Sequence, residues 1–567
     1  MYMKKIVLCV ALLGISIAVK AQKSGEVVKQ MKNDLSYLAS DQLEGRLTGS
    51  SGEMRSSLYI ADLFKQYKIS PKGNDSGSYF QTFSIIKMRI AQGQSIMLWT
   101  EKDEKKYGLK SNKGEFYPLA QSCNHDSLNE TAVYQAGYGI TAPEFNYNDY
   151  ADTTGIRGKV FVIRLGSPES GNAHGRYEPY ESLTYKVDQA IKMGARGVVF
   201  VNVNPNIEAP KGQLDRTVKP RNIPVVYANG LQPSILNAKS ISFSVNIAQI
   251  NSTAHNVIGM IDNHKAKTII IGAHQDHLGY NEFGGSREPK SGQIHNGADD
   301  NASGVSMILS LAKQIKKNKK WRQHNYVFIA FSGEEQGLLG SNHFVKHPSI
   351  DLKTVLYMLN YDMVGRLDSV KKTLMVYGVG TSPAWKTALA SVQTDSSQIK
   401  IKTTESGTGS SDHTSFYYAN IPVLHFFTGQ HQDYHTPSDD ETKINYGGML
   451  QVYNISLDVM KALNTTNEMP FTATKSEESE KMSFKVTLGI MPDYVFDGVG
   501  LRVDGVNLGK PGEKAGLLKG DIIIKMGDYS ISNIQDYMKS LGQFKKGQTT
   551  TIEVKRGNDT KTLEVTF

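Results

Sequence analysis

Lys267-Thr-Ile-Ile-Ile-Gly-Ala273-His274-Gln-Asp276-His277 joins a short apolar run directly to a cluster of polar side chains. The apolar part is typical of a strand buried on both faces, and such strands belong to parallel or mixed sheets. Similar runs recur between residues 251 and 465, with helical patterns between them, at 326–331, 354–359, 373–377 and 421–427. We therefore predict an α/β fold in which helices sandwich a mixed, mainly parallel sheet.

Five polar motifs lie at or just after these apolar runs, and each holds one residue of a metal-binding type. In chain order these residues are His274, Asp300, Glu335, Asp362 and His435. Ligands of such sheets collect beyond the carboxyl ends of the strands, which is where the motifs lie. Two imidazoles and three carboxylates suit two zinc-like ions that share one carboxylate. The set predicts a metal-dependent hydrolase.

The start of the chain has the pattern of a secretory signal peptide. A basic stretch ending at Lys5 precedes the apolar run 6–19, and Val19-Lys20-Ala21 supplies small residues for cleavage. Removal of residues 1–21 takes away three lysines and no acid, so the formal charge falls from +9 to +6. It also leaves Cys123 as the single cysteine, so no internal disulfide can form. We expect an exported protein of a periplasm or cell exterior, without a lipid anchor.

Two other classes of partner are disfavoured. No stretch after the signal approaches the roughly 18 consecutive apolar residues of a membrane span. The basic run 313–322 is typical of the solvated end of a helix, where cations are favourable. Neither aromatic interleaving nor a nucleic-acid motif accompanies that run, so we expect no nucleic-acid partner.

At 567 residues the chain is too long for one core, and its pattern of apolar and polar residues changes several times along the sequence. A helix-rich lead-in covers about residues 25–70, interrupted by Gly45-Arg-Leu-Thr-Gly49-Ser-Ser-Gly52, which predicts a flexible connection. The predicted order is a signal peptide (1–21), the N-terminal part of the catalytic domain (22–110), an inserted domain (111–250), the main catalytic part (251–465), a polar linker (466–481) and a small β-rich module (482–567).

Both accessory regions resemble known domains. Residues 111–250 contain a Gly158-Lys-Val-Phe-Val strand and a helix leading to Gly194-Ala-Arg-Gly-Val, and so resemble the protease-associated domain. Lys510-Pro-Gly-Glu-Lys-Ala-Gly516-Leu-Leu-Lys-Gly520-Asp521 resembles a PDZ domain of the bacterial protease-associated type. By that resemblance the loop Leu488-Gly489-Ile490-Met491 would hold the C-terminal carboxylate of a peptide, which would add to the sheet edge as a strand. A PDZ fold that serves only as a spacer is the alternative.

Residues 251–465, completed by about 25–110, resemble the dizinc exopeptidases that include bacterial leucyl aminopeptidase, within the glutamate carboxypeptidase superfamily. The resemblance implies that His274 and Asp362 bind one Zn²⁺, that Glu335 and His435 bind the other, and that Asp300 bridges them. Asp276 would orient His274, and Glu334 would be the general base and acid. Two cations about 3.5–4 Å apart would lower the pKa of a bridging water, so that hydroxide attacks the peptide carbonyl.

The expected activity is that of an exported zinc metallopeptidase, an aminopeptidase acting on the N-termini of peptides. A carboxypeptidase of the same superfamily is the nearest alternative, and Arg366 is its candidate for binding a substrate carboxylate. A glutaminyl cyclase would use one zinc, and a non-catalytic PDZ or protease-associated binding protein would not need Glu334. The sequence leaves open which end of a peptide is cut.

Three further features of the sequence bear on the chemistry. Ser411-Asp412-His413 contains serine-hydrolase residue types, but consecutive residues cannot form a relay, and the resemblance places them in the wall of the substrate pocket. His277 is interpreted as supporting or structural. The single-helix signature His-Glu-x-x-His is absent, which argues against the thermolysin class.

Overall fold

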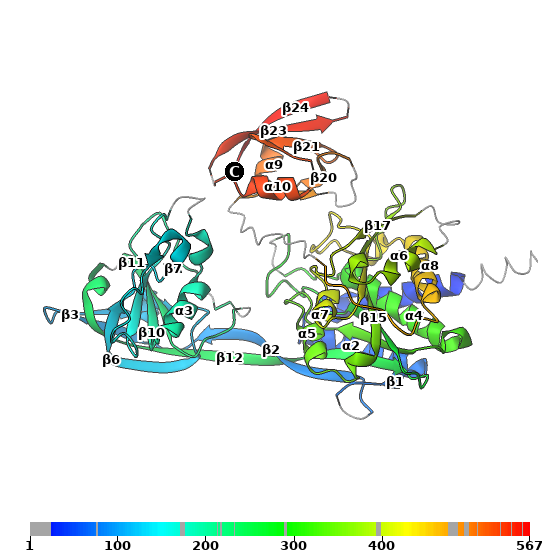
Figure 1. The fold of residues 1–567 in the computed structure, drawn as a ribbon, viewed down its shortest axis with the longest axis horizontal. Coiled ribbons are helices and arrows are strands. Elements are labelled where there is room, and N and C mark those ends of the chain that lie inside the picture. Colours follow the sequence, from blue (N-terminus) through cyan, green and yellow to red (C-terminus); the bar gives the residue numbers. More distant parts are fainter. Residues whose placement is uncertain are drawn as a thin grey trace, which may run out of the picture. The chain divides into compact units, whose positions relative to one another are not determined.

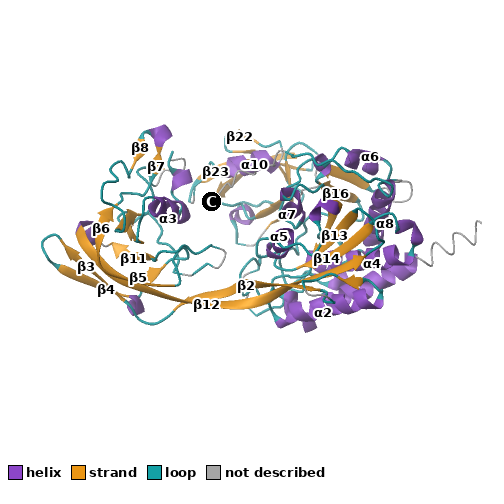
Figure 2. Ribbon diagram, turned by 60° about the horizontal axis from the view of Figure 1, so that its bottom comes forward, coloured by secondary structure: helices purple, strands orange, loops and turns teal. Residues whose placement is uncertain are grey.

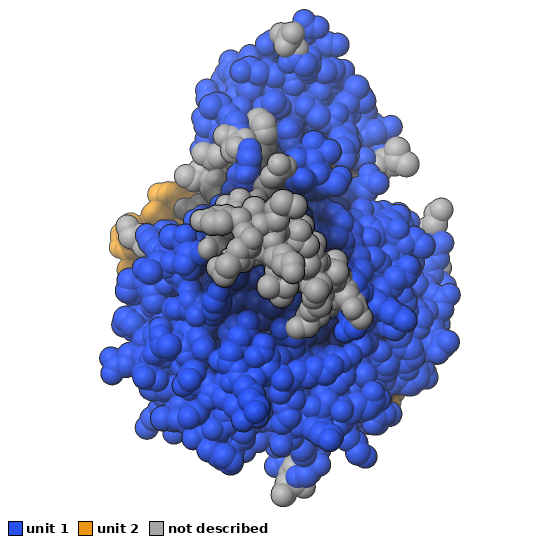
Figure 3. All heavy atoms as spheres, turned by 90° about the vertical axis from the view of Figure 1, so that its right-hand side faces the viewer, with its two compact units in different colours: residues 1–84, 253–542, 546–567 blue, residues 85–252, 543–545 orange. Residues whose placement is uncertain are grey.

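The computed structural model describes residues 24–567 except 75–76, 171–175, 213, 216–217, 232, 289–291, 393–398, 475–485, 493–497, 507–508, 533, 546 and 558. The predicted signal peptide 1–21 and much of the predicted linker 466–481 lie outside the described residues. The chain divides into two compact units, coloured separately in Figure 3. The second unit comprises Ile85–Ser252 and Gln543–Lys545. No described helix is both long and apolar enough to cross a membrane.

The first unit is built on the predicted mixed sheet. Four neighbouring strands run parallel in the order β14 (Asn325–Phe331), β13 (Thr268–His274), β15 (Val355–Tyr361) and β18 (Val423–Phe427). Beyond them, β16 (Thr373–Tyr377) is antiparallel to β18 and pairs with β17 (Lys400–Thr404), while the end of β12 (Ala238–Ile261) is antiparallel to β14. The predicted fold class is confirmed (Figure 1).

Alternate residues of β13 belong to opposite cores, because side chains along a strand alternate between the two faces of the sheet. Ile269 and Ile271 pack into one core, against α2 (Ser51–Gln66), α4 (Gly304–Lys317), α6 (Ala384–Ala390) and α8 (Tyr446–Ala462). Ile270 packs into the other core, with side chains of α5 (Leu339–Lys346) and α7 (His413–Tyr418). Helices therefore cover both faces of the parallel strands (Figure 2).

The stretch Gly45–Gly52 is packed into the first unit, so the prediction of a flexible connection is wrong. It includes the end of η1 (Asp41–Arg46) and the start of α2, with Arg46 only 1% exposed. The Ser50 side chain caps α2 by accepting a hydrogen bond from the Glu53 amide. Glycine and serine here allow close packing and capping rather than mobility.

The second unit is centred on a sheet in which β6 (His125–Gln135), β9 (Val160–Arg164), β10 (Gly197–Asn202) and β11 (Val225–Leu231) run parallel in that order. The helix α3 (Leu183–Lys192) packs its Val187 and Ala190 against this sheet. Antiparallel strands β3 (Ile96–Glu101), β4 (Lys106–Lys110) and β5 (Phe116–Pro118) extend it. The unit begins at Ile85, and the predicted domain start at residue 111 stays a prediction.

The C-terminal region forms an antiparallel sheet in the order β19 (Ile490–Pro492), β20 (Leu501–Val506), β21 (Ile522–Met526), β23 (Thr549–Arg556) and β24 (Asp559–Thr566). A short strand, β22 (Tyr529–Ser530), pairs with β21, and two helices complete the region, α9 (Pro511–Lys514) and α10 (Ile534–Leu541). Val503, Ile523 and Val554 are fully or almost fully buried and form part of its core.

Asp34 provides a test of this packing. It lies in the helix 24–38, fully buried, and its Oδ1 accepts hydrogen bonds from Tyr59 Oη and Gln30 Nε2, both at 2.8 Å. Burial raises the pKa of Asp34 from 3.8 to about 6. Between these values the folded protein binds more protons than the unfolded chain, so stability falls as pH rises from about 4 to 6.

Asp34→Asn should remove this loss of folding stability at higher pH. We expect the variant to match the parent near pH 4 and to exceed its stability at pH 7 by up to about 3 kcal/mol, because each pKa unit corresponds to about 1.4 kcal/mol. Denaturant unfolding of both proteins at the two pH values measures the difference. Asp62→Asn, at an exposed position of α2, is the control and should change little. A pH-independent difference for Asp34→Asn would contradict the prediction.

Candidate metal centre

The five predicted metal ligands lie at one edge of the sheet, beyond the carboxyl ends of its parallel strands. His274 is the last residue of β13, Asp362 follows β15 directly, and Glu335 lies shortly after β14. The loop after β18 carries His435, and the turn Ala298–Ser303 before α4 carries Asp300. Because parallel strands end at the same edge, residues far apart in sequence meet there.

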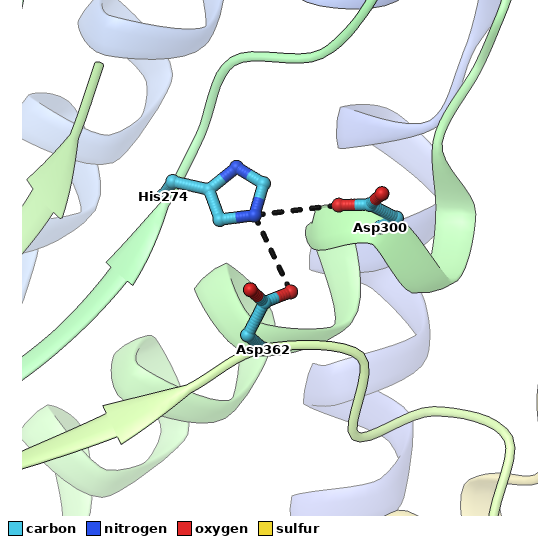
Figure 4. A group of neighbouring side chains, drawn as sticks. All are labelled: His274, Asp300 and Asp362. Atoms are coloured by element: carbon cyan, nitrogen blue, oxygen red, sulfur yellow. Dashed lines mark hydrogen bonds and ion pairs between the residues drawn. The ribbon is translucent and has the colours of Figure 1, made fainter. Parts of the chain in front are cut away.

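His274, Asp300 and Asp362 form the first group that could hold a cation. Nε2 of His274 lies 3.3 Å from Oδ1 of Asp300 and 3.3 Å from Oδ1 of Asp362. Figure 4 shows the imidazole pointing from the end of its strand toward both carboxylates. One nitrogen and two carboxylate oxygens thus converge closely enough to bind a single ion.

A second group forms around Glu335 and the same Asp300. Nε2 of His435 lies 3.2 Å from Oδ2 of Asp300 and 3.2 Å from Oε2 of Glu335. Nδ1 of His277 lies 2.7 Å from Oε1 of Glu335 and 3.9 Å from Oδ2 of Asp300. Asp300 therefore turns one oxygen toward each group, which is the arrangement that a shared carboxylate needs.

His277 lies closer to the candidate ligands than the sequence indicated. Its ring is buried and packs edge-on against His435, with 5.7 Å between the ring centroids. With Asp300 and Glu335 it satisfies the geometry of a possible cation site. Strand alternation ends at His274, so no periodicity predicts where a side chain three residues later will point. The sequence placed His277 near the candidate ligands only through its position in the same polar motif as His274.

His274 lies closer to the main-chain oxygen of Asp276 than to its carboxylate, so the predicted role of that carboxylate stays a prediction. Nδ1 of His274 lies 3.1 Å from the main-chain oxygen of Asp276 and 3.7 Å from its Oδ1. A proton on Nδ1 satisfies this contact and leaves the Nε2 lone pair free for a metal. The Asp276 carboxylate is fully buried, and it accepts hydrogen bonds from Thr48 Oγ1 at 2.8 Å and from the Glu334 amide at 3.2 Å.

The carboxylates give the site a strong affinity for positive charge. Burial disfavours the charged form of His435, but the carboxylates of Glu335 and Asp300 outweigh it and raise its pKa to about 11. Burial is likewise outweighed at His274, where Asp362 and Glu334 help to raise the pKa well above its usual value. Imidazoles that bind a metal must be neutral, so cation binding here would release protons.

Glu334 lies beside the two groups and belongs to neither. Burial raises its pKa well above the ordinary value, and the nearby carboxylates of Asp362 and Glu335 raise it further, against the opposing effect of His274. A raised pKa makes a carboxylate a stronger base, which suits a group that takes up and returns a proton.

Ser411, Asp412 and His413 do not act as a relay. The Ser411 hydroxyl donates to Oδ2 of Asp362 at 2.8 Å and accepts from Nδ2 of Asn360 at 2.8 Å, so it orients a candidate ligand. The His413 ring stacks on His425 with 4.5 Å between centroids. Asp412 is fully buried. No local sequence pattern predicts this bond, because Ser411 and Asp362 lie 49 residues apart.

Comparison with known proteins gives two family matches. Residues 256–460 match peptidase family M28, and residues 473–567 match a PDZ domain. Aminopeptidase YwaD of Bacillus subtilis is 26% identical over 429 residues, which covers 70% of this chain and 77% of that protein. A probable leucine aminopeptidase of Arthroderma otae is 30% identical over 217 residues, but these cover only 37% of this chain and 56% of the relative.

Among solved structures, an aminopeptidase from Aneurinibacillus aligns with 79% of this chain and 95% of its own, at 24% identity and a TM-score of 0.45. A zinc aminopeptidase from Bacillus subtilis aligns with 77% of this chain and 94% of its own, at 22% identity and a TM-score of 0.40. The strand-end cluster lies within the M28 match, since the cluster runs from His274 to His435. The predicted resemblance to a metallopeptidase family is confirmed over residues 256–460, which match peptidase family M28, and residues 473–567 match a PDZ domain.

Proposed function

We propose that this protein is a zinc-dependent aminopeptidase that removes N-terminal residues from peptides. The observation that carries the proposal is the Asp300 carboxylate, whose two oxygens face two separate groups of possible ligands. His274 and Asp362 would hold one Zn²⁺, Glu335 and His435 would hold the other, and Asp300 would be shared. When bound, the ions would supply Lewis-acid chemistry, which lowers the pKa of water and stabilises negative charge on a carbonyl oxygen.

Glu334 is the proposed general base and acid. It adjoins the candidate ligand Glu335, and burial and neighbouring carboxylates raise its pKa, which makes it a stronger base. In the proposed reaction it takes a proton from the attacking water and delivers it to the amine of the departing peptide. Asp276 accepts a hydrogen bond from the Glu334 amide and faces His274, so it would orient base and ligand together.

Two observations support attack at the amino end of the substrate. The named relatives YwaD of Bacillus subtilis and the Arthroderma otae protein are aminopeptidases. Arg366, the candidate for binding a substrate carboxylate, instead pairs with Asp433, with Nη2 3.2 Å from Oδ2. Asp433 also binds Lys443 at 2.6 Å. Arg366 and Lys443 therefore both pair with Asp433 within the protein.

The accessory regions fit a peptidase that meets its substrates outside the cytoplasm. We propose export by residues 1–21 and a protease-associated domain around residues 111–250. In the PDZ domain, β19 is the terminal strand of its sheet order, so a peptide strand could add beside it. Gly489 has φ +68° in the loop before β19, and its amide donates to Thr487 Oγ1 at 2.9 Å. Peptide C-termini are the proposed ligands of this domain.

The zinc content of the protein tests whether Asp300 is shared by two metal ions. The purified protein should bind about two Zn²⁺ per chain, and zinc should raise its melting temperature because it binds the folded state preferentially. Asp300→Asn should lower the zinc content and abolish most of this rise, since it weakens both groups. Metal analysis and thermal unfolding with and without chelator measure these changes. Asp262→Asn, at an exposed position, should behave like the parent, and an unchanged zinc content in Asp300→Asn would refute the assignment.

The role of Glu334 can be separated from metal binding. Glu334→Gln should lower kcat by about 10²–10⁴-fold, because the amide cannot accept the proton, while zinc content stays at the parental level. Steady-state hydrolysis of leucyl-p-nitroanilide, paired with metal analysis, gives both quantities. Glu468→Gln, at an exposed position, is the matched control. Parental kcat in Glu334→Gln would exclude the proposed base.

The end of the peptide that is cut can be decided with blocked substrates. Peptides with a free amino group and an amidated C-terminus should lose N-terminal residues, because the proposed metal ions could bind a free α-amino group but not an acetylated one. N-acetylated peptides with a free carboxylate should remain intact. Mass spectrometry of both sets of peptides, with and without chelator, identifies the cleavage products. Cleavage of the N-acetylated set alone would identify a carboxypeptidase instead.

A further inference from the structure

The M28 match begins at residue 256, yet the metal centre contacts a segment more than 200 residues earlier in the chain. We call residues 45–48 the brace segment. Arg46 and Thr48 of this segment are 1% and 2% exposed. Gly45 has φ +66°, and a Cβ added there would lie 2.5 Å from the main-chain oxygen of His295. The segment is thus held against the loops of the centre by close backbone packing.

Arg46 joins the loop that follows His274 to the loop that leads to the shared carboxylate of Asp300. Its Nε donates to the main-chain oxygen of Gln275 at 2.7 Å, next to His274. Its Nη1 donates to the oxygen of Asn296 at 2.7 Å, and its Nη2 donates to that of Gly297 at 3.0 Å, in the loop that leads to Asp300. A planar guanidinium with donors in fixed directions can bind both loops at once, and an ammonium group cannot.

The backbone of the brace segment adds contacts to the first of these loops. The amide of His277 donates to the oxygen of Arg46 at 3.2 Å, and the amide of Gly279 donates to that of Gly45 at 3.0 Å. Leu47 and His277 form a parallel bridge. The segment therefore continues the pairing of the chain just beyond β13, where the strand itself has ended.

Thr48 selects which oxygen of Asp276 faces the site. Its hydroxyl donates to Oδ2 at 2.8 Å. The other oxygen, Oδ1, accepts from the Glu334 amide at 3.2 Å and lies 3.7 Å from Nδ1 of His274. One hydroxyl thus fixes a carboxylate that contacts both a candidate ligand and the residue proposed as the base.

We propose that Arg46 and Thr48 are positioning residues of the metal centre, with Arg46 fixing the spacing of the loops that bear His274 and Asp300 and Thr48 fixing the orientation of Asp276. This inference rests on the proposed metal-dependent function. It extends the working site to a part of the chain outside the M28 match, because the ligands keep their geometry only while the brace segment holds the loops that carry them.

The Thr48 hydroxyl can be removed almost without a change of shape. Thr48→Val deletes the donor, and Thr48→Ser keeps it. In full-length protein loaded with Zn²⁺ or Co²⁺, Thr48→Val should weaken zinc binding by about 10–100-fold and change the visible absorption bands of bound cobalt. Thr48→Ser should restore parental affinity and spectrum. Competition with a chromophoric chelator measures affinity, and the cobalt spectrum reports ligand geometry without reference to peptide hydrolysis.

The control is a buried threonine hydroxyl elsewhere in the fold. Thr381 is fully buried and donates to the oxygens of Gly378 and Val423. Thr381→Val should lower the melting temperature and leave the cobalt spectrum unchanged. Parental affinity and spectrum in Thr48→Val, or an equal change in Thr381→Val, would overturn the positioning role while the metal function stands. A parent protein that binds neither ion would overturn both.

Arg46 is tested by a change that keeps its charge. Arg46→Lys should make the amides of residues 275–279 and 292–300 exchange with deuterium faster in the metal-free protein, because one ammonium cannot hold both loops. Thr48→Val should leave the 292–300 exchange at the parental rate, since Thr48 contacts only the first loop. Parental exchange of both loops in Arg46→Lys would overturn the role of Arg46.

Discussion

The crowding of carboxylates at one buried edge of the sheet is the constraint on which the rest of this site depends. Asp300, Glu335 and Asp362 lie within contact distance of His274, His277 and His435. Like charges in a partly buried space repel one another unless cations or protons offset them. The same carboxylates raise the pKa values of His274 and His435, so these imidazoles favour the charged form. The proposed pair of divalent cations would meet this demand for positive charge without leaving any imidazole protonated.

The surrounding fold supplies the rigidity that such crowding requires. His274, Asp362 and Glu335 lie at or near the ends of adjacent parallel strands whose two faces are covered by separate cores. The support then extends outward through hydrogen bonds, from Ser411 to Asp362 and from Thr48 to Asp276. These contacts fix side chains that a cation alone could not orient, which is the usual arrangement around protein metal sites.

Much of this could be predicted from the sequence, for identifiable reasons. The five apolar runs of the catalytic region became strands within one or two residues of their expected limits, because an uninterrupted apolar run has few alternatives to a buried strand. The stretch Gly45–Gly52 is packed, although its composition predicted a flexible connection. Glycine and serine occur in closely packed segments as well as in flexible linkers. The sequence around Arg46 does not predict its role, because three of its partners are the main-chain oxygens of Gln275, Asn296 and Gly297, more than 200 residues away.

The sequence by itself determined the types of the candidate ligands, their order along the chain and their placement after strands, since these follow from composition and local periodicity. Only the tertiary structure decided which of them meet, that His277 lies against Glu335, and that Arg366 is engaged by Asp433. The strand order β14-β13-β15-β18 departs from chain order. Distances between ligands therefore depend on how the strands pair and on how the loops beyond them pack, and no local pattern encodes either.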